Sequence, residues 1–242
     1  MPGSLTQRIA PGLRRRVDMV RHRGNAVGCP LCGGRFDRFK DAWNRPNALC
    51  WRCGSHERHR AQWLLFTTHP ELLRAPRSLL HFAPEWTMRE RIAPIAAERG
   101  IRYVTADLDP AGVDLRLDLT ALDLPDDAFE AVICSHVLEH IPDDAAAMRE
   151  LRRVTAPGGW CLVMVPLDVT RTETYEDPGV TTPEERRREF LQDDHVRLYA
   201  PDIAERLAAA GFAVEIVRPE DLGPDAVRRA GLLPADWMFL CR

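Results

Sequence analysis

The chain has 242 residues, of which 45% are apolar and 29% charged, and its formal net charge is −3. This length suits one large α/β domain or a domain with a small appendage. No apolar run of about 18 residues is present, and the N-terminus lacks the apolar core of a secretory signal. We therefore expect a cytoplasmic protein that does not enter a membrane.

The charge is unevenly divided along the chain. Residues 1–60 carry twelve Arg and one Lys against four acidic residues, which makes this segment basic and the rest acidic. A basic segment can attract nucleic acid, an acidic substrate or the acidic body of its own chain. Because the two charges are complementary, we favour packing of the segment against the body.

Four of the seven cysteines form two CxxC pairs separated by 17 residues, and these are Cys29, Cys32, Cys50 and Cys53. Four thiolates at this spacing predict a structural zinc site with no open position for a reacting water. The metal would help to fold a segment that is too small for its own core. The other three cysteines (Cys134, Cys161 and Cys241) stand singly in apolar stretches and are expected to be buried.

The region after the cysteines predicts a link between two parts. Helical spacing begins at Glu57, and we expect residues 1–60 to form the zinc module and 61–77 to form a connecting helix. Arg58, His59 and Arg60 could join the module to the next domain or hold an anionic substrate. A solvated helix face is the alternative.

From residue 78 onward, short apolar runs alternate with amphipathic segments, which predicts a doubly wound α/β domain over 78–242. Strands are expected over 78–83, 101–108, 160–167, 212–217 and 236–241 and within 113–122 and 128–138, with helices over about 86–98, 143–155 and 201–212. We expect the APGG stretch to stop the helix over 143–155.

Candidate ligand residues follow successive strands of this domain. Glu85 follows the first strand, Asp107 the second, Asp118 lies in the third segment, and residues 134–136 end the fourth. Ligands of open parallel sheets bind at the carboxyl ends of the strands. Asp107 is placed to bond a ribose diol, yet the turn before it, LHFAPEW, contains no glycine.

The stretch LDLPDDAFEAVICSHVLEHIPDDAAAMRELRRVTAPGGWCLVMVPL resembles the central half of a class I S-adenosylmethionine-dependent methyltransferase. The resemblance covers about residues 78–242 and implies a Rossmann-like, seven-stranded sheet whose last strand is antiparallel. With CWRCGSHERHR ahead of it, the chain is similar to a bacterial subgroup that carries an N-terminal four-cysteine, zinc-ribbon-like module. The implied cofactors are S-adenosylmethionine and a structural Zn²⁺.

Carried over by position, the resemblance implies which residues bind the cofactor. Asp107 with Leu108 would hold the ribose hydroxyls, Asp118 with Leu119 would lie by the adenine, and Ser135 with His136 would line the methyl-transfer opening. The methionine end would be lined by His81, Phe82, Ala83, Pro84 and Glu85. The chain departs from the family here, because this loop has no glycine; we expect Glu85 to face the ammonium or sulfonium group.

Histidine suits general-base chemistry at neutral pH, and His136 and His195 are the candidate bases. His195 follows Asp194, which could orient a histidine, within a long insert after the fifth strand. His140 is expected to be structural. The insert also supplies Tyr175, Arg197 and Tyr199 as candidate substrate contacts.

Three functions fit these features. The first is methylation of a small molecule, such as a natural-product intermediate or sugar, at oxygen or nitrogen. The second is methylation of ribosomal or transfer RNA gripped by the zinc module, although the module is poor in lysine and has few aromatic residues besides Trp43 and Trp51. The third is a non-catalytic, zinc-dependent interaction protein.

Overall fold

The protein is described by a computed structural model that covers residues 11–42 and 45–242. Trp43 and the first ten residues of the expected module lie outside this part. Among the described residues, no helix is both long and apolar enough to cross a membrane.

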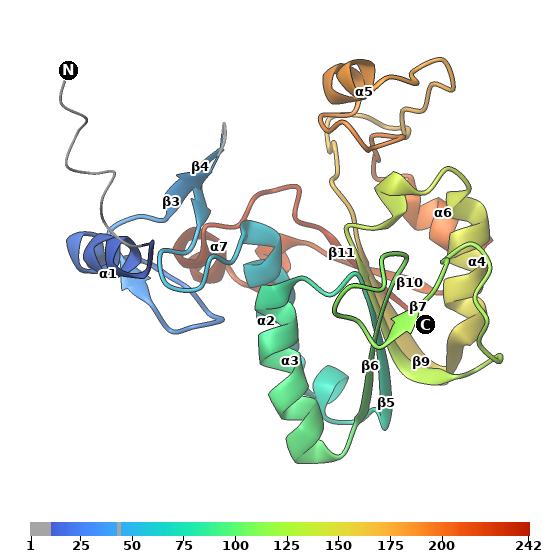
Figure 1. The fold of residues 1–242 in the computed structure, drawn as a ribbon, viewed down its shortest axis with the longest axis horizontal. Coiled ribbons are helices and arrows are strands. Elements are labelled where there is room, and N and C mark those ends of the chain that lie inside the picture. The colour runs from blue at the N-terminus through green and yellow to red at the C-terminus, as the bar shows by residue number, and fades with distance from the viewer. Residues whose placement is uncertain (1–10, 43–44) are drawn as a thin grey trace.

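Seven strands form one sheet in the order β10-β11-β9-β8-β5-β6-β7 (Figure 1). Their bounds are β5 Ser78–Phe82, β6 Arg102–Asp107, β7 Leu115–Arg116, β8 Phe129–Ser135, β9 Thr155–Met164, β10 Val214–Val217 and β11 Met238–Cys241. Neighbours from β7 to β9 pair in parallel, whereas β11 is antiparallel to both β9 and β10. The predicted seven-stranded sheet with an antiparallel last strand is confirmed.

Helices cover both faces of this sheet (Figure 1). One face is packed by α2 (Glu57–Thr68) and α3 (Trp86–Arg99), and the other by α4 (Asp144–Val154) and α6 (Ile203–Ala209). Successive residues of a strand point to opposite faces, so Ile133 of β8 joins the α2–α3 side and Val132 the α4–α6 side. This two-sided burial explains why residues 131–134 of β8 are all apolar.

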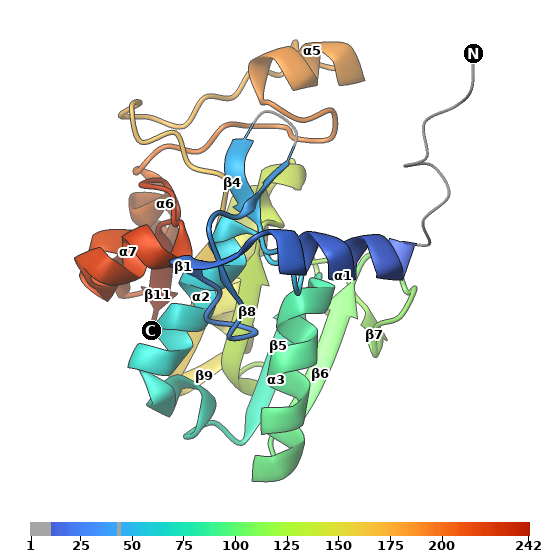
Figure 2. The same cartoon turned by 90° about the vertical axis from the view of Figure 1, so that its left-hand side faces the viewer.

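The remaining elements are short. They are η2 (Pro70–Leu73), η3 (Leu138–His140), α5 (Pro183–Glu189), η4 (Pro219–Leu222) and α7 (Pro224–Ala230). Figure 2 shows α5, within the long insert after β9, on the side of the sheet toward which β8 points. The insert therefore lies at the edge where the carboxyl ends of the parallel strands meet.

The N-terminal module consists of α1 (Pro11–Arg21) and two small antiparallel sheets, formed by β1 (Arg23–Gly28) with β2 (Arg35–Phe36) and β3 (Lys40–Ala42) with β4 (Arg45–Leu49). Its buried Phe36 and Phe39 belong to the same apolar cluster as Leu65 of α2 and Leu79 of β5. The module therefore extends the core of the α/β domain. The connecting helix begins at Glu57, within the range first expected for the module.

The end of α4 differs from the expected glycine stop. Thr155 already has an extended backbone, with φ −82° and ψ 117°, and the chain passes directly into β9. Gly158 and Gly159 lie inside β9, where the pairing with β8 shifts register. A Cβ on Gly159 would lie 2.4 Å from the carbonyl oxygen of Glu130. Gly159 therefore allows close approach of two strands, Gly158 adopts a φ of 77°, and neither caps the helix.

Candidate active site and metal centre

The four cysteines of the two CxxC pairs converge in the module, with their sulfur atoms within 4.8 Å of one another. Gly33 and Gly54 follow each pair with φ values of 69° and 72°, and each donates its N–H to the first cysteine's carbonyl, at 2.8 and 2.9 Å. These are two copies of one turn that glycine adopts without strain. The turns aim all four sulfurs at a common point.

The sulfur spacing fits a tetrahedral metal ion. Cys29 Sγ lies 3.5 Å from Cys53 Sγ, and Cys32 Sγ lies 3.6 Å from Cys50 Sγ. Four thiolates about 2.3 Å from a tetrahedral zinc are about 3.8 Å apart. The donor set and its geometry therefore suit Zn²⁺ in a closed site.

Arg60 fastens the module to the far end of the chain. Its guanidinium is fully buried and donates to Ala48 O at 2.9 Å and Ser55 O at 2.7 Å in the module. It also donates to Ala230 O and, at 3.3 Å, to Gly231 O, both at the end of α7. The expectation that this segment joins the module to the next domain is met by Arg60.

A second contact reaches the predicted cofactor loop. Arg58 and His59 of α2 both bond the carboxylate of Glu85, which immediately precedes α3. His56 N–H donates to Nδ1 of His59 at 3.1 Å, so Nε2 carries the proton given to Glu85. Glu85 therefore points to α2, and its carboxylate holds the loop against the module's connecting helix. Glu85 was expected to contact the cofactor, but its carboxylate instead binds Arg58 and His59.

The backbone is strained where β5 and β8 end. Ala83, just after β5, has φ 42°, and His136, just after β8, has φ 57°. A left-handed conformation costs a residue with a Cβ about 1–2 kcal/mol. These neighbouring strands flank the point at which the strand order reverses, where open α/β sheets bind ligands. Ala83 adopts the conformation that glycine commonly provides, so the loop has the turn without the glycine.

The adjacent strand ends carry the predicted ribose and adenine groups. Asp107 ends β6, and its carboxylate accepts one bond from Asp109 N at 3.1 Å. Leu108 beside it is 62% exposed. Asp118 accepts from Thr120 N and Oγ1 at 2.9 and 2.7 Å, while Leu119 is buried. An acid and an exposed apolar side chain at one strand end suit a nucleoside.

Several side chains predicted to line the cofactor instead pack inside the protein. Phe82 belongs to the core on the α4 side, and His81 is buried with Nδ1 2.9 Å from the hydroxyl of Tyr103. Burial lowers the pKa of His81 to about 3, so this imidazole is neutral. Only their backbone atoms remain for a ligand. Pro84 is half-buried, and Ser135 is buried at the end of β8.

The insert brings His195 to the segment that follows β8. His195 lies in contact with His140, with ring centres 4.8 Å apart, and Glu139, His140 and His195 place one donor atom each within 4.8 Å of one another. We call these three residues the histidine–glutamate cluster. Asp194 orients His140, with 3.3 Å between Oδ2 and Nδ1, rather than its neighbour His195. His136 flanks the cluster, with Nδ1 3.3 Å from Glu139 Oε1.

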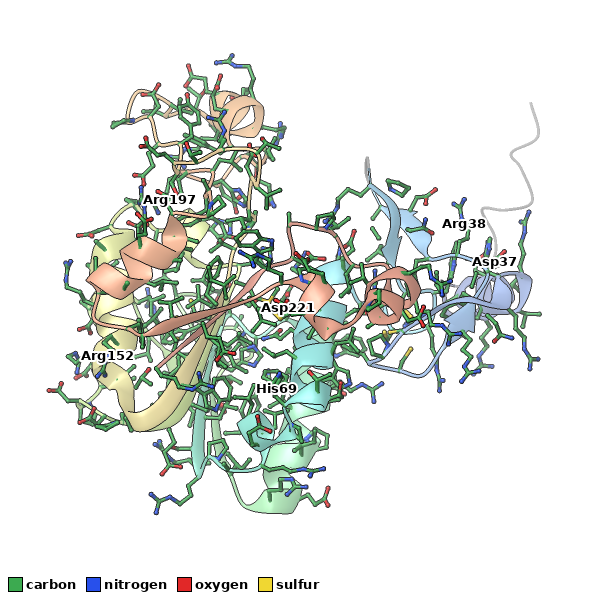
Figure 3. The ribbon with its side chains drawn as sticks, turned by 180° about the vertical axis from the view of Figure 1, so that it is seen from behind. Asp37, Arg38, His69, Arg152, Arg197 and Asp221 are labelled. Atoms are coloured by element: carbon green, nitrogen blue, oxygen red, sulfur yellow. The ribbon has the colours of Figure 1, made fainter. Side chains whose placement is uncertain are left out.

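Two of the three predicted substrate contacts prove to be structural. Arg197 is buried and donates to the carbonyls of Leu138 and Pro142 at 3.0 and 2.8 Å, where the insert meets the body (Figure 3). Tyr199 is fully buried and donates to Asp144 at 2.7 Å. Their polar groups are used inside the protein and do not face a substrate. Tyr175 is half-buried, pairs with Leu198 and packs on Phe190 with ring centres 5.6 Å apart.

The comparisons with known proteins agree with this geometry. Residues 89–163 match a family described as "Methyltransferase domain". Over 135 residues the chain is 38% identical to a probable S-adenosylmethionine-dependent methyltransferase of Mycolicibacterium smegmatis, covering 51% of this chain and 48% of that protein. It is 35% identical to a demethylmenaquinone methyltransferase of Mycobacterium marinum, covering 37% and 46%.

The chain spans about half the length of these curated relatives. Among solved structures, a SAM-dependent methyltransferase from Archaeoglobus fulgidus is similar with 15% identity and a TM-score of 0.48, covering 77% of this chain and 94% of that chain. The sheet order and the match over residues 89–163 support a methyltransferase domain. The relatives that the chain resembles are methyltransferases, and one of them is described as probably S-adenosylmethionine-dependent.

Two features of this edge were missed from the sequence alone. The approach of His140 to His195 and Glu139 was not predicted, although His136, Glu139 and His140 share the i, i+3, i+4 spacing of one turn. That spacing was the available signal. The contact of Arg58 and His59 with Glu85 was also missed, because the only signal for it in the sequence was the presence of cationic residues at the start of α2.

Proposed function

We propose that the chain transfers a methyl group from S-adenosylmethionine to an oxygen or nitrogen of a small molecule. The observation that carries this proposal is the strand-end arrangement of Ala83, Asp107 and Leu108 beside the left-handed turn at His136. When bound, the cofactor supplies an electrophilic methyl group on its sulfonium sulfur. The acceptor atom forms the bond to carbon as the sulfur–carbon bond breaks, and S-adenosylhomocysteine leaves.

The residues at this edge fit the cofactor. Asp107 can accept hydrogen bonds from both ribose hydroxyls, and the exposed Leu108 can cover one face of the adenine. The left-handed turn at Ala83 brings backbone close to the ligand, as glycine-rich turns do. No pyrophosphate is present in this cofactor, so a cradle of several glycines is not required.

His136 is the favoured base for an acceptor that must lose a proton. Its Nδ1 faces Glu139 Oε1 at 3.3 Å, so an N–H at this nitrogen leaves Nε2 as the proton acceptor. His136 is also the first residue after β8, beside the expected methyl-transfer opening. His195 is the less favoured base, because its side chain is buried.

Calorimetric titration with S-adenosylhomocysteine tests the cofactor site. Asp107→Ala should weaken binding by about 10-fold or more, because each hydrogen bond to a charged group contributes about 1.5–3 kcal/mol. Asp123→Ala, at an exposed acid outside the site, should bind like the wild-type protein. Failure of the wild-type chain to bind would favour a non-catalytic interaction protein.

RNA is the second candidate acceptor, favoured by the exposed cations of the module. Arg15, Arg16, Arg21, Arg23, Arg35, Arg38, Lys40 and Arg52 are all exposed. Trp51, however, is stacked on His22 with ring centres 4.2 Å apart and donates to Arg38 O, so it has no free face for a base on that side. RNA binding that weakens steeply with salt, and is lost on replacing Arg23, Arg35 and Arg38 by Gln, would support this alternative.

We also propose that the four cysteines hold a structural Zn²⁺, and that the protein acts in the cytoplasm. A closed set of four thiolates leaves no position for a substrate. Metal analysis of the purified chain should find one tightly held zinc, and a value near zero would contradict the assignment.

A further inference from the structure

The histidine–glutamate cluster contains two buried polar atoms that have no hydrogen-bond partner within the part of the chain that the structure describes. They are Glu139 Oε2 and His195 Nε2, on side chains whose residues are 1% and 2% exposed. An unpaired polar group in a protein interior is costly, and a carboxylate more so. Both residues belong to the group whose donor atoms lie within 4.8 Å of one another. The third member, His140, completes a set of two imidazoles and one carboxylate.

The partners of the two imidazoles leave a metal-binding nitrogen on each. His195 Nδ1 lies 3.1 Å from the carbonyl oxygen of Phe190, which can only accept, so Nδ1 carries the proton and Nε2 a lone pair. His140 Nδ1 lies 3.3 Å from Asp194 Oδ2, while its Nε2 is on the side of Glu139, 3.9 Å from Oε1. Metal-binding histidines characteristically donate their second nitrogen to a carbonyl or carboxylate in this way.

The backbone holds the two halves of the cluster together. Val196 N–H, directly after His195, donates to the carbonyl of Glu139 at 2.9 Å. Arg197 then fixes the same two segments by donating to Leu138 O. The donor atoms are therefore positioned by main-chain contacts as well as by side-chain packing. Such support from neighbouring groups is what a preorganised metal site requires.

We propose that Glu139, His140 and His195 bind a divalent transition-metal ion. Imidazole ligands favour ions such as Mn²⁺, Fe²⁺, Co²⁺ or Zn²⁺ over Mg²⁺, which prefers oxygen. Three protein ligands leave further coordination positions open, in contrast to the cysteine site. This assignment gives the unpaired Glu139 Oε2 and His195 Nε2 a positively charged partner.

The position of the ion indicates the class of acceptor, an inference that rests on the proposed function. Glu139 also contacts His136, the proposed base at the methyl-transfer opening. A metal ion there would bind a hydroxyl oxygen of the acceptor and lower its pKa, so that the proton passes to His136 before the oxygen–methyl bond forms. The favoured acceptors are therefore molecules with a metal-binding hydroxyl group, such as a vicinal diol or a phenol.

Titration of the zinc-loaded full chain with Co²⁺, followed by calorimetry and visible absorption, tests this site. We expect one additional equivalent without the strong absorption of a cobalt–thiolate site, which separates it from exchange at the cysteines. His195→Gln and Glu139→Gln should each weaken binding by about 100-fold or more, and Asp194→Asn by about 10-fold. His69→Gln, at an exposed histidine remote from the cluster (Figure 3), should bind Co²⁺ as the wild type does.

Absence of the additional equivalent, or equal affinity in the wild type and both cluster variants, would overturn the proposal. If His195→Gln does not fold, Glu139→Gln and Asp194→Asn give the same comparison. S-adenosylhomocysteine binding, measured on the same samples, separates the two proposals. A wild-type chain that binds S-adenosylhomocysteine but no additional Co²⁺ rejects the metal site alone, and a wild-type chain that binds the additional Co²⁺ but no S-adenosylhomocysteine rejects the proposed function alone.

Discussion

The four-cysteine cluster and the histidine–glutamate cluster gather their donor atoms in opposite ways. The cysteines come from two copies of one short turn, and the spacing of those turns is visible in the sequence. Glu139 and His140 come from the turn after β8, while His195 arrives from the insert after β9. The cysteine cluster is built from a short turn that occurs twice in one segment, whereas the histidine–glutamate cluster is brought together only when the sheet has formed.

The difference teaches which part of the molecule maintains structure and which part is available for chemistry. Four sulfurs surround a closed centre, and residues near them pack into the core. Two nitrogens and one carboxylate would leave coordination positions open on a bound metal ion, and they lie next to strained backbone at His136. Variants should therefore affect stability most in the module and affect binding most at the strand ends.

The largest expected effect follows loss of a cysteine. Cys50→Ser should lose zinc and unfold β1–β4, because structural zinc contributes about 10–16 kcal/mol of apparent binding free energy in small zinc domains. Metal analysis and hydrogen exchange of the module would measure this. Cys241→Ala, outside the cluster, should keep its zinc. Glu139→Gln should leave hydrogen exchange in the module unchanged. If this variant lost as much protection from exchange as Cys50→Ser, the contrast between the two clusters would be wrong.

The next largest effect should come from breaking the link between the two regions. Arg60→Met removes a buried cation that bonds carbonyls of both the module and α7, and should lower the free energy of unfolding by about 3–5 kcal/mol. Urea unfolding would measure it. Arg35→Met, at an exposed site, should change stability by no more than about 0.5 kcal/mol. Similar losses in both variants would show that Arg60 does not fasten the module.

A smaller, pH-dependent effect is expected at Glu85. Burial would raise the pKa of this carboxyl, but the hydrogen bond from His59 and the charge of Arg58 outweigh it and hold the pKa far below its usual range. A lowered pKa stabilises the fold above about pH 4.5, and this contribution is lost as the pH falls further.

Glu85→Gln should therefore cost about 1–3 kcal/mol at pH 7 and less at pH 3. Urea unfolding at the two pH values compares the variant with the wild type. Glu90→Gln, at an exposed position of α3, should show no such trend. A cost at Glu85 that is the same at both pH values would mean that the charge does not hold the loop to α2.

The smallest expected effect is a gain in stability. Ala83→Gly relieves a left-handed alanine, worth about 1–2 kcal/mol, against an entropic cost of about 0.5–1 kcal/mol for glycine. The net gain should be up to about 1 kcal/mol in urea unfolding. Ala97→Gly in α3 should lose about 1 kcal/mol. A loss in both variants would remove the evidence for strain at the cofactor loop.

The sequence was sufficient for the sheet because its signals are local. The strands and helices of 78–242 appear as alternating apolar runs, and the CxxC spacing predicted the gathered cysteines. The helix end at Val154 was misjudged, since Gly159 serves the pairing of β8 with β9 rather than the end of the helix. The sequence alone does not show whether a glycine ends a helix or allows two strands to approach each other closely.

The candidate site was harder to predict because its geometry depends on distant segments. Arg197 and Tyr199 were expected to face a substrate, but contacts with Leu138 and Asp144 bury them. Sequence patterns do not show a positive φ at an alanine, nor that Asp194 pairs with His140. These features appear only when the insert packs on the turn after β8.

The bonds of Arg60 to Ala230 and Gly231 span 170 and 171 residues of chain. During synthesis the module therefore leaves the ribosome long before the segment on which it docks. Phe39 also packs beside Gly231, so this side of the module's docking face is completed only when the segment around α7 has been made. Early capture of zinc would give the waiting module a fixed shape, and truncation after β10 would leave it packed on α2 and β5 without the bonds of Arg60 to α7.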